Sequence, residues 1–197
     1  VTTAEHGETT CRAVIVATDA GSAAKLLPGL HLPRFHTVTT VHHVAPFPPL
    51  REPALLLAAD RSGPVAYSVV ASEVDPDCAQ DGRAVISSTV LGPDERGPAE
   101  LDAAVRAHLA ALHGVDTTEW ELLAVHRHRE ALPVMSPPHH IRRPVRLLGG
   151  LYVCGDHRDT STAQGALYSG RRAALHLLRD FGLSAEGDPS APDLVAA

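Results

Sequence analysis

Short apolar runs that alternate with turn residues dominate the part of the chain before residue 95. The turns between these runs are rich in proline, glycine and aspartate, which separate strands rather than extend helices. In the run at 65–72, odd and even positions differ in polarity, as in a sheet with one covered face. The succession predicts an antiparallel sheet. Its four strand-like segments are 37–44, 54–60, 65–72 and 84–90.

A helical period follows these strands. Pro98 is suited to the first turn of a helix, and Gly114 is suited to its end. Residues 119–128 then resume a strand-like pattern. We therefore expect one long helix, with a single apolar face, between the sheet and its last strand. The apolar positions at helical spacing are Leu101, Val105, Leu109 and Leu112.

Two further segments have the pattern of a strand followed by a helix. In the first, the apolar run within 12–20 leads into a short alanine-rich helix at 21–27. In the second, the strand and acid at 150–156 lead into a helix at 161–174. Ser161 and Gln164 have the spacing of a capping box, which predicts the start of that helix. We expect Ile15 and Val153, from the two strands, to lie in one layered unit.

Small residues fill the first turns of this second helix. Gly165, Ser169 and Gly170 leave little side-chain bulk there, although a glycine inside a helix costs about 1 kcal/mol relative to alanine. We expect another group to approach this backbone closely, either a bound ligand or a neighbouring element of the fold. A ligand suits the position, because open α/β sheets bind ligands at the carboxyl ends of their strands and helix N-termini attract anions.

These residues resemble the carboxy-terminal FAD-binding motif of the superfamily of flavin amine oxidases, phytoene desaturases and protoporphyrinogen oxidases. The shared pattern is an apolar strand, Gly-Asp, a short loop, small-x-Gly-Ala and Ser-Gly-Arg-Arg-Ala-Ala. The resemblance implies that Gly155 and Asp156 contact the ribityl or pyrophosphate part of FAD. It also implies that the backbone at 163–165 faces the pyrimidine carbonyl of the flavin. The implied FAD-binding set is Gly155, Asp156, Thr162, Ala163, Gln164, Gly165 and Ala166.

The dinucleotide fingerprint Gly-x-Gly-x-x-Gly does not occur in the chain, and the sequence begins at Val1 without an initiator methionine. The segment at 12–29 is similar to the stretch where members of this superfamily re-enter the FAD domain. We therefore expect the carboxy-terminal part of a longer flavoprotein, as a fragment or an incomplete gene model, which is inactive by itself. The alternative is that these residues are the complete protein.

The order of elements predicts an α/β fold combined with an α+β insertion. By the resemblance, 1–30 is part of a Rossmann-like FAD/NAD(P)-binding lobe, and 131–183 returns to that lobe as strand, Gly-Asp and helix. Residues 31–130 are then the inserted substrate-binding lobe, built on a mostly antiparallel sheet and a long helix. The composition of 184–197 predicts a disordered tail.

The motif at 128–133, with Ala-Leu-Pro at its end, resembles desaturase-like and protoporphyrinogen oxidase-like members. Aromatic residues make up 4% of the chain, which leaves few for an aromatic cage around an amine. The resemblance thus implies hydride transfer from an apolar small molecule to FAD, with no catalytic side chain assigned. The alternatives are a flavin amine oxidase and, from another class, a non-enzymatic interaction or structural module without a cofactor.

Charge and composition limit the classes of partner that this chain is expected to bind. The net charge of −6 argues against nucleic acid, because phosphate binding needs clustered cations. No run approaches the roughly 20 apolar residues of a transmembrane helix, which is compatible with peripheral membrane contact. The 3 cysteines lack any Cys-x-x-Cys spacing, so no zinc or disulfide framework is expected. We expect a cytoplasmic protein without a metal, although His126 and His128 share a strand face, and the oligomeric state stays open.

Overall fold

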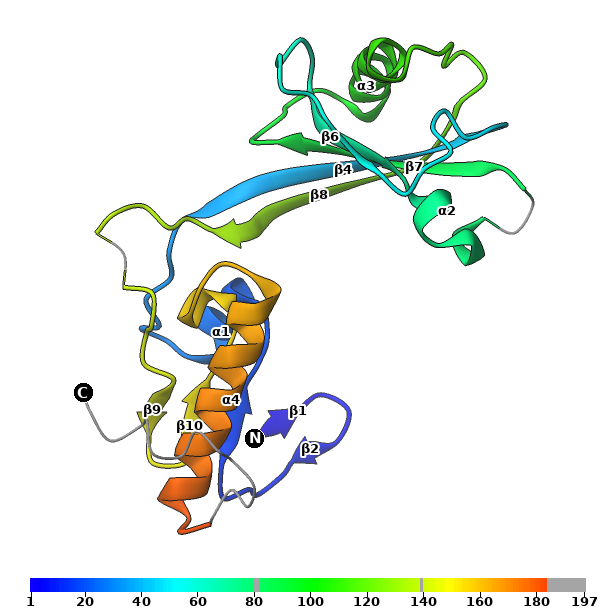
Figure 1. The fold of residues 1–197 in the computed structure, drawn as a ribbon. Helices are drawn as coiled ribbons and strands as arrows, with labels where there is room; N and C mark the ends of the chain where they lie inside the picture. Colours follow the sequence, from blue (N-terminus) through cyan, green and yellow to red (C-terminus); the bar gives the residue numbers. More distant parts are fainter. Residues whose placement is uncertain (80–81, 139, 184–197) are drawn as a thin grey trace. The chain divides into compact units, whose positions relative to one another are not determined.

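The computed structural model describes residues 1–79, 82–138 and 140–183. It is a mixed α/β fold with antiparallel sheets and a few helices, and it divides into two compact units (Figure 1). Unit 1 joins Val1–Arg34 to the described part of Leu132–Ala197, and unit 2 is Phe35–Ala131. The tail that we expected to be disordered, 184–197, lies outside the described residues.

Unit 2 is built on a five-stranded sheet with the strand order β5-β6-β7-β4-β8. The pairs β5–β6, β6–β7 and β7–β4 are antiparallel, as the sequence predicts. The longest of these pairings joins β4 to β7 from Val38 and Leu91 to Ala45 and Ala84. The strands are β4 (Phe35–Ala45), β5 (Leu55–Leu57), β6 (Val65–Val70), β7 (Ala84–Leu91) and β8 (Glu121–Pro133).

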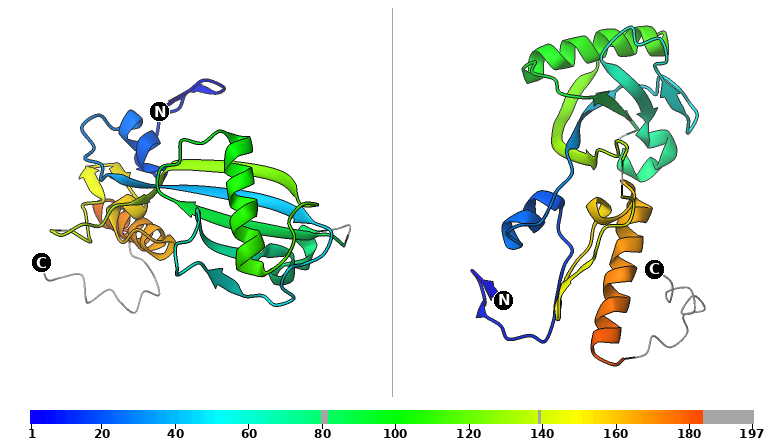
Figure 2. Two further views of the ribbon diagram at one scale, coloured as in Figure 1. Left: turned by 90° about the horizontal axis from the view of Figure 1, so that it is seen from above. Right: turned by 90° about the vertical axis from the view of Figure 1, so that its left-hand side faces the viewer.

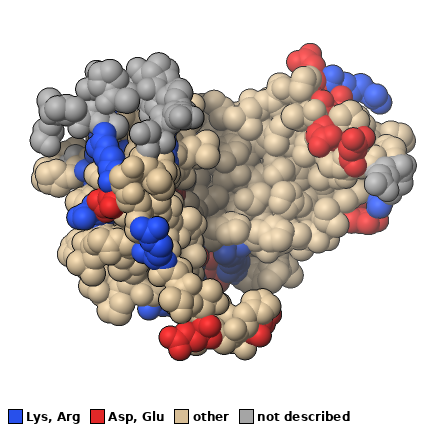
Figure 3. Space-filling view, turned by 90° about the horizontal axis from the view of Figure 1, so that it is seen from below, with Lys and Arg blue, Asp and Glu red and all other residues tan. Residues whose placement is uncertain are grey.

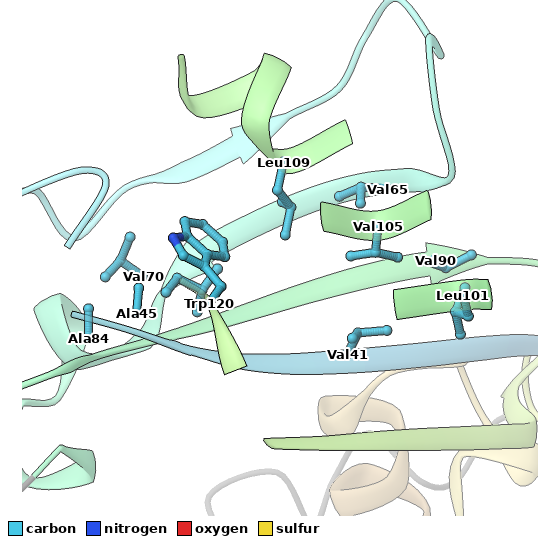
Figure 4. Close-up of a cluster of buried hydrophobic side chains, with 11 residues drawn as sticks. Val41, Ala45, Val65, Val70, Ala84, Val90, Leu101, Val105, Leu109 and Trp120 are labelled. Atoms are coloured by element: carbon cyan, nitrogen blue, oxygen red, sulfur yellow. The ribbon is translucent and has the colours of Figure 1, made fainter. Parts of the chain in front are cut away.

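Helix α3 (Pro98–His113) lies across one face of this sheet (Figure 2). It ends at Gly114, whose φ of 67° lies in the left-handed region that glycine adopts most readily. The predicted apolar face packs on the sheet, and each fully buried side chain contributes roughly 1.5–3 kcal/mol. Figure 4 shows the side chains of this core, which include Leu101, Val105, Leu109, Val41, Val65 and Trp120.

Several strand boundaries in unit 2 differ from the sequence prediction, and the strand predicted at 54–60 is shortened to β5 at Leu55–Leu57. The strand predicted at 65–72 ends at Val70, because Ala71–Val74 forms the short helix α2, which a 3-10 turn at Pro76–Cys78 follows. The strand predicted at 119–128 continues as β8 to Pro133. A long neighbour explains this extension, since Thr37 of β4 still donates a hydrogen bond to the carbonyl oxygen of Arg129 at 3.3 Å.

The core of unit 2 also contains a polar contact between the buried ring of His43 and the carboxylate of Asp102. The Nε2 atom of His43 lies 2.8 Å from Oδ1 of Asp102 in α3, and Oδ2 of Asp102 lies 3.1 Å from a guanidinium nitrogen of Arg106. Burial lowers the pKa of His43, and the contact with Asp102 opposes that shift. Sheet and helix are therefore joined by a polar contact as well as by apolar packing.

We expect the free energy of unfolding to fall as the pH is lowered from about 7.5 to about 5.5. Burial lowers the pKa values of His43, His113 and His157 in the folded protein, so the unfolded chain binds more protons in this range. The lowered pKa values of Asp94 and Asp180 act below this range, because aspartate titrates near pH 4. Urea unfolding at a series of pH values measures the effect, and a stability that is constant or rises toward pH 5.5 contradicts it.

Unit 1 contains a three-stranded sheet with the order β3-β10-β9. Strand β10 (Leu151–Val153) pairs in parallel with β3 (Val14–Val16) and antiparallel with β9 (Arg146–Leu148). The expectation that Ile15 and Val153 belong to one layered unit is confirmed, since their strands are neighbours in this sheet. A separate hairpin of two-residue strands, β1 (Thr2–Thr3) and β2 (Gly7–Glu8), precedes the sheet.

Each face of this sheet packs against one helix. Val153 belongs to a buried cluster with residues of helix α1 (Ala20–Leu26), whereas Tyr152 and Cys154 belong to a cluster with Ala173 of helix α4 (Ala163–Asp180). Successive residues of a strand point to opposite faces, so the sheet lies between the two helices. This layering brings the end of β10 to the beginning of α4.

Candidate functional site

The candidate site begins at Gly155, directly after β10. The φ of Gly155 is +146°, and a Cβ atom there would lie 2.6 Å from ring atoms of His157. Both facts disfavour a larger residue at this position. The fully buried hydroxyl of Ser169 accepts a hydrogen bond from the N–H of Gly155 at 2.9 Å. Ser169 thereby ties the second turn of α4 to the end of the strand.

The N-cap residue of α4 differs from the one that the sequence predicts. Thr162 is the N-cap, and its Oγ1 accepts a hydrogen bond from the N–H of Gly165 at 2.9 Å. The predicted capping box of Ser161 and Gln164 is therefore wrong. Because the helix begins one residue later, Gly165 rather than Gln164 occupies the third helical position, and it has no side chain to complete the box.

The start of α4 is open to solvent. Thr162, Ala163 and Gln164 are exposed, Ala166 is half-buried, and Gly165 is buried. In any α-helix the N–H groups of the first residues have no carbonyl acceptor within the helix. The exposed N–H groups of Ala163 and Gln164 are thus suited to a carbonyl or anionic acceptor.

The group that approaches Gly165 belongs to this chain. A Cβ atom on Gly165 would overlap the carbonyl oxygen of Thr160 and lie 2.5 Å from its Oγ1. Gly170 has far more room, since the nearest atom to its Cβ position is the Sγ of Cys154 at 4.0 Å. The close packing expected from the small residues therefore occurs at Gly165, against the loop that leads into the helix.

That loop carries charged residues in unequal environments. It begins with the 3-10 turn Asp156–Arg158, in which one third of the Asp156 side chain is exposed (33%), whereas His157 (2%) and Arg158 (5%) are buried. Burial lowers the pKa of His157, and the nearby Arg158 and Arg143 lower it further. Neither ring nitrogen of His157 has a hydrogen-bond partner among the described residues. An unsatisfied buried donor of this kind costs about 1–3 kcal/mol.

Arg172 of α4 holds the loop in place. Its guanidinium lies 2.9 Å from Oδ2 of Asp159, and both side chains are largely buried. It also donates hydrogen bonds to the carbonyl oxygens of Arg143 at 2.7 Å and Arg158 at 3.3 Å. Sequence reasoning gave Arg172 no role. The signal that points to it is its spacing from Ser169, three residues earlier and so on the same helix face.

The structure places the residues that the resemblance assigned to a cofactor in two elements that contact each other, the turn at Gly155 and Asp156 and the start of α4. A partly exposed carboxylate can accept a hydrogen bond from a hydroxyl group, and the exposed helix start can donate hydrogen bonds to a carbonyl or phosphate oxygen. This site suits recognition of a polar ligand. The described residues contain no group of three or more His, Cys, Asp or Glu side chains placed to hold a metal ion.

Figure 3 shows the charges on one face of the molecule. Lysine and arginine side chains there form small separate groups rather than one continuous basic patch. None of the described helices has both the length and the apolar character needed to cross a bilayer.

Comparisons with known proteins identify a family that matches this chain and solved structures of similar fold. Residues 1–178 match the family described as flavin containing amine oxidoreductase. The structure is similar to that of reduced UDP-galactopyranose mutase, with 15% identity and a TM-score of 0.59 over 78% of this chain and 35% of that one. It is also similar to a protein from Pyrococcus furiosus, with 11% identity and a TM-score of 0.57 over 93% of this chain and 44% of that one.

At these identities the likeness shows the fold alone. The chain spans less than half of either solved structure, at 35% and 44% of their lengths. Comparison with curated proteins gives no match.

Proposed function

Because the chain belongs to the flavin-containing amine oxidoreductase family, we propose that it forms part of an FAD-dependent oxidoreductase of dehydrogenase or desaturase type. When bound, FAD supplies the hydride acceptor, and the protein supplies binding and orientation. The observation that carries the proposal is the β10–α4 connection, in which Asp156 directly follows the turn at Gly155 and the exposed start of α4 follows the loop.

The residues of this connection fit FAD by their chemistry. The carboxylate of Asp156 is partly exposed and suits a ribityl hydroxyl. The N–H groups of Ala163 and Gln164 suit a carbonyl oxygen of the flavin. The ring nitrogens of His157, in the same loop, have no hydrogen-bond partner among the described residues, and Nδ1 lies 3.8 Å from Oδ1 of Asp156. Thr162, Gly165 and Ala166 would hold the helix start in position.

The two units suggest separate roles in binding the cofactor and the substrate. We propose that residues 1–30 and 131–183 belong to the FAD-binding lobe and that residues 31–130 form the substrate-binding lobe. The chain has no Gly-x-Gly-x-x-Gly to hold a pyrophosphate, so residues 1–197 alone are proposed to be inactive.

An apolar substrate is supported by the sheet face opposite α3. Leu55 and Leu57 of β5 are exposed, and they pair with Val69 and Tyr67 of β6. Directly paired residues share a face, so this surface of unit 2 offers the apolar side chains of Leu55, Leu57 and Val69 beside Tyr67. We therefore favour a dehydrogenase or desaturase over an amine oxidase.

One observation favours a second candidate function. Since Thr160 already fills the space beside Gly165, the small residues of α4 have a packing role that needs no ligand. On that basis the alternative is an interaction or structural module that binds no cofactor.

Asp156→Ala distinguishes the two candidates. In protein expressed from the complete reading frame, we expect about tenfold weaker FAD binding, because the hydrogen bond to a buried ribityl hydroxyl is lost. The dissociation constant is measured by flavin fluorescence, with circular dichroism to check the fold. Glu121→Gln, which alters an exposed carboxylate of β8, serves as the control and should leave the constant unchanged. Absence of FAD binding by the unaltered protein would favour the module without a cofactor, whereas equal constants for all three proteins would show that Asp156 does not contact FAD.

A further inference from the structure

Unit 1 contains an apolar pocket that the proposed flavin site leaves unexplained. Its volume is about 490 Å³, which lies within the range of about 300–1,000 Å³ of small-molecule sites. The walls come from the end of α1, the turn after it, β9 and β10. The principal apolar lining residues are Leu27, Leu30, Pro144, Leu147, Leu148 and Leu151.

Arg158 is the one arginine or lysine that lines this pocket among the described residues. Although only 5% of the residue is exposed, its Nε atom has no hydrogen-bond partner in the described part of the chain. The neighbouring carboxylate of Asp159 pairs with Arg172 instead. Burial and the nearby Arg143 lower the pKa of the Arg158 guanidinium.

A buried charge is stable only when it is paired and hydrogen-bonded. Arginine presents several N–H donors in a planar fork that matches a carboxylate, and each such contact is stronger than a neutral hydrogen bond. The leucines around Arg158 favour apolar carbon at the same time. The pocket therefore combines one anion-binding group with an apolar wall.

We propose that this pocket binds an amphiphilic anion, an apolar molecule that ends in a carboxylate, with the carboxylate paired to Arg158. The apolar walls of the pocket include none of the residues assigned to FAD, whereas Arg158 belongs to the same 3-10 turn as Asp156. The inference goes beyond the oxidoreductase activity and holds whether or not FAD is bound.

The test compares decanoate with decan-1-ol, which has the same apolar chain without the charge. Isothermal titration calorimetry on protein from the complete reading frame should show decanoate binding about tenfold more tightly than decan-1-ol. In Arg158→Met the two ligands should bind equally, at the affinity of decan-1-ol. Arg142→Met removes an exposed arginine of the same unit and should keep the tenfold preference.

Arg158→Met is expected to fold, because an apolar side chain of similar length replaces a largely buried guanidinium whose Nε atom has no hydrogen-bond partner among the described residues. Arg158→Lys provides a second variant, which keeps the charge and should retain a preference for decanoate. The proposal is overturned if decanoate does not bind, if both ligands bind the unaltered protein equally, or if Arg158→Met keeps the preference.

Discussion

Replacing Gly165 with alanine should lower the free energy of unfolding by about 3 kcal/mol or more. The added Cβ would overlap the carbonyl oxygen of Thr160, which is backbone and cannot rotate away. The loop has little freedom to retreat, because the N–H of Thr160 donates a hydrogen bond to Oδ1 of Asp159 at 2.9 Å and Arg172 holds that carboxylate. The start of α4 would have to move or unfold.

Gly170→Ala is the matched control on the same helix. Its Cβ would meet only the Sγ of Cys154, at the ordinary contact distance of 4.0 Å. Alanine there should raise stability by about 0.5–1 kcal/mol, because it is a better helix former. Urea unfolding of both variants measures the difference. Equal effects of the two substitutions would show that Thr160 does not restrict Gly165.

Arg172→Met should destabilise the protein by about 3–5 kcal/mol, the usual effect of removing one partner from a buried ion pair. Asp159 would remain as a largely buried carboxylate without its guanidinium. The carbonyl oxygens of Arg143 and Arg158 would each lose a donor as well. Since these residues position the loop after β10, we also expect weaker FAD binding in the protein from the complete reading frame.

Urea unfolding measures this loss, and a double variant tests its cause. Adding Asp159→Leu to Arg172→Met should recover part of the stability, because no charge is then left unpaired. Glu121→Gln breaks the exposed ion pair with Arg83 and should change stability by less than about 1 kcal/mol. If Arg172→Met behaved like Glu121→Gln, the buried contacts of Arg172 would not hold the loop.

Local pattern determined the elements of this protein. Apolar spacing and Gly114 located α3, and alternation located the antiparallel strands of unit 2. The pattern of strand, Gly-Asp and helix was enough to indicate the β10–α4 connection. These features depend on residues within a few positions of one another, so one stretch of sequence contains all the information that they need.

Other boundaries depended on partners outside the local pattern. The extension of β8 to Pro133 follows from its long neighbour β4, and the sequence of 119–133 does not indicate it. Thr162 rather than Ser161 caps α4, although both are good capping residues, because the conformation of the preceding loop selects between them. The intrinsic preference for an N-cap residue is met by either Ser161 or Thr162.

Only the tertiary structure decided how the site is assembled. Ser169 reaches Gly155 from 14 residues away, and Arg172 joins the carbonyl oxygen of Arg143 across 29 residues. The burial of His157 and Arg158 follows from the layers that pack around an otherwise polar loop. Hydrogen bonds and desolvation depend on distances between groups far apart in the sequence, and folding alone sets those distances.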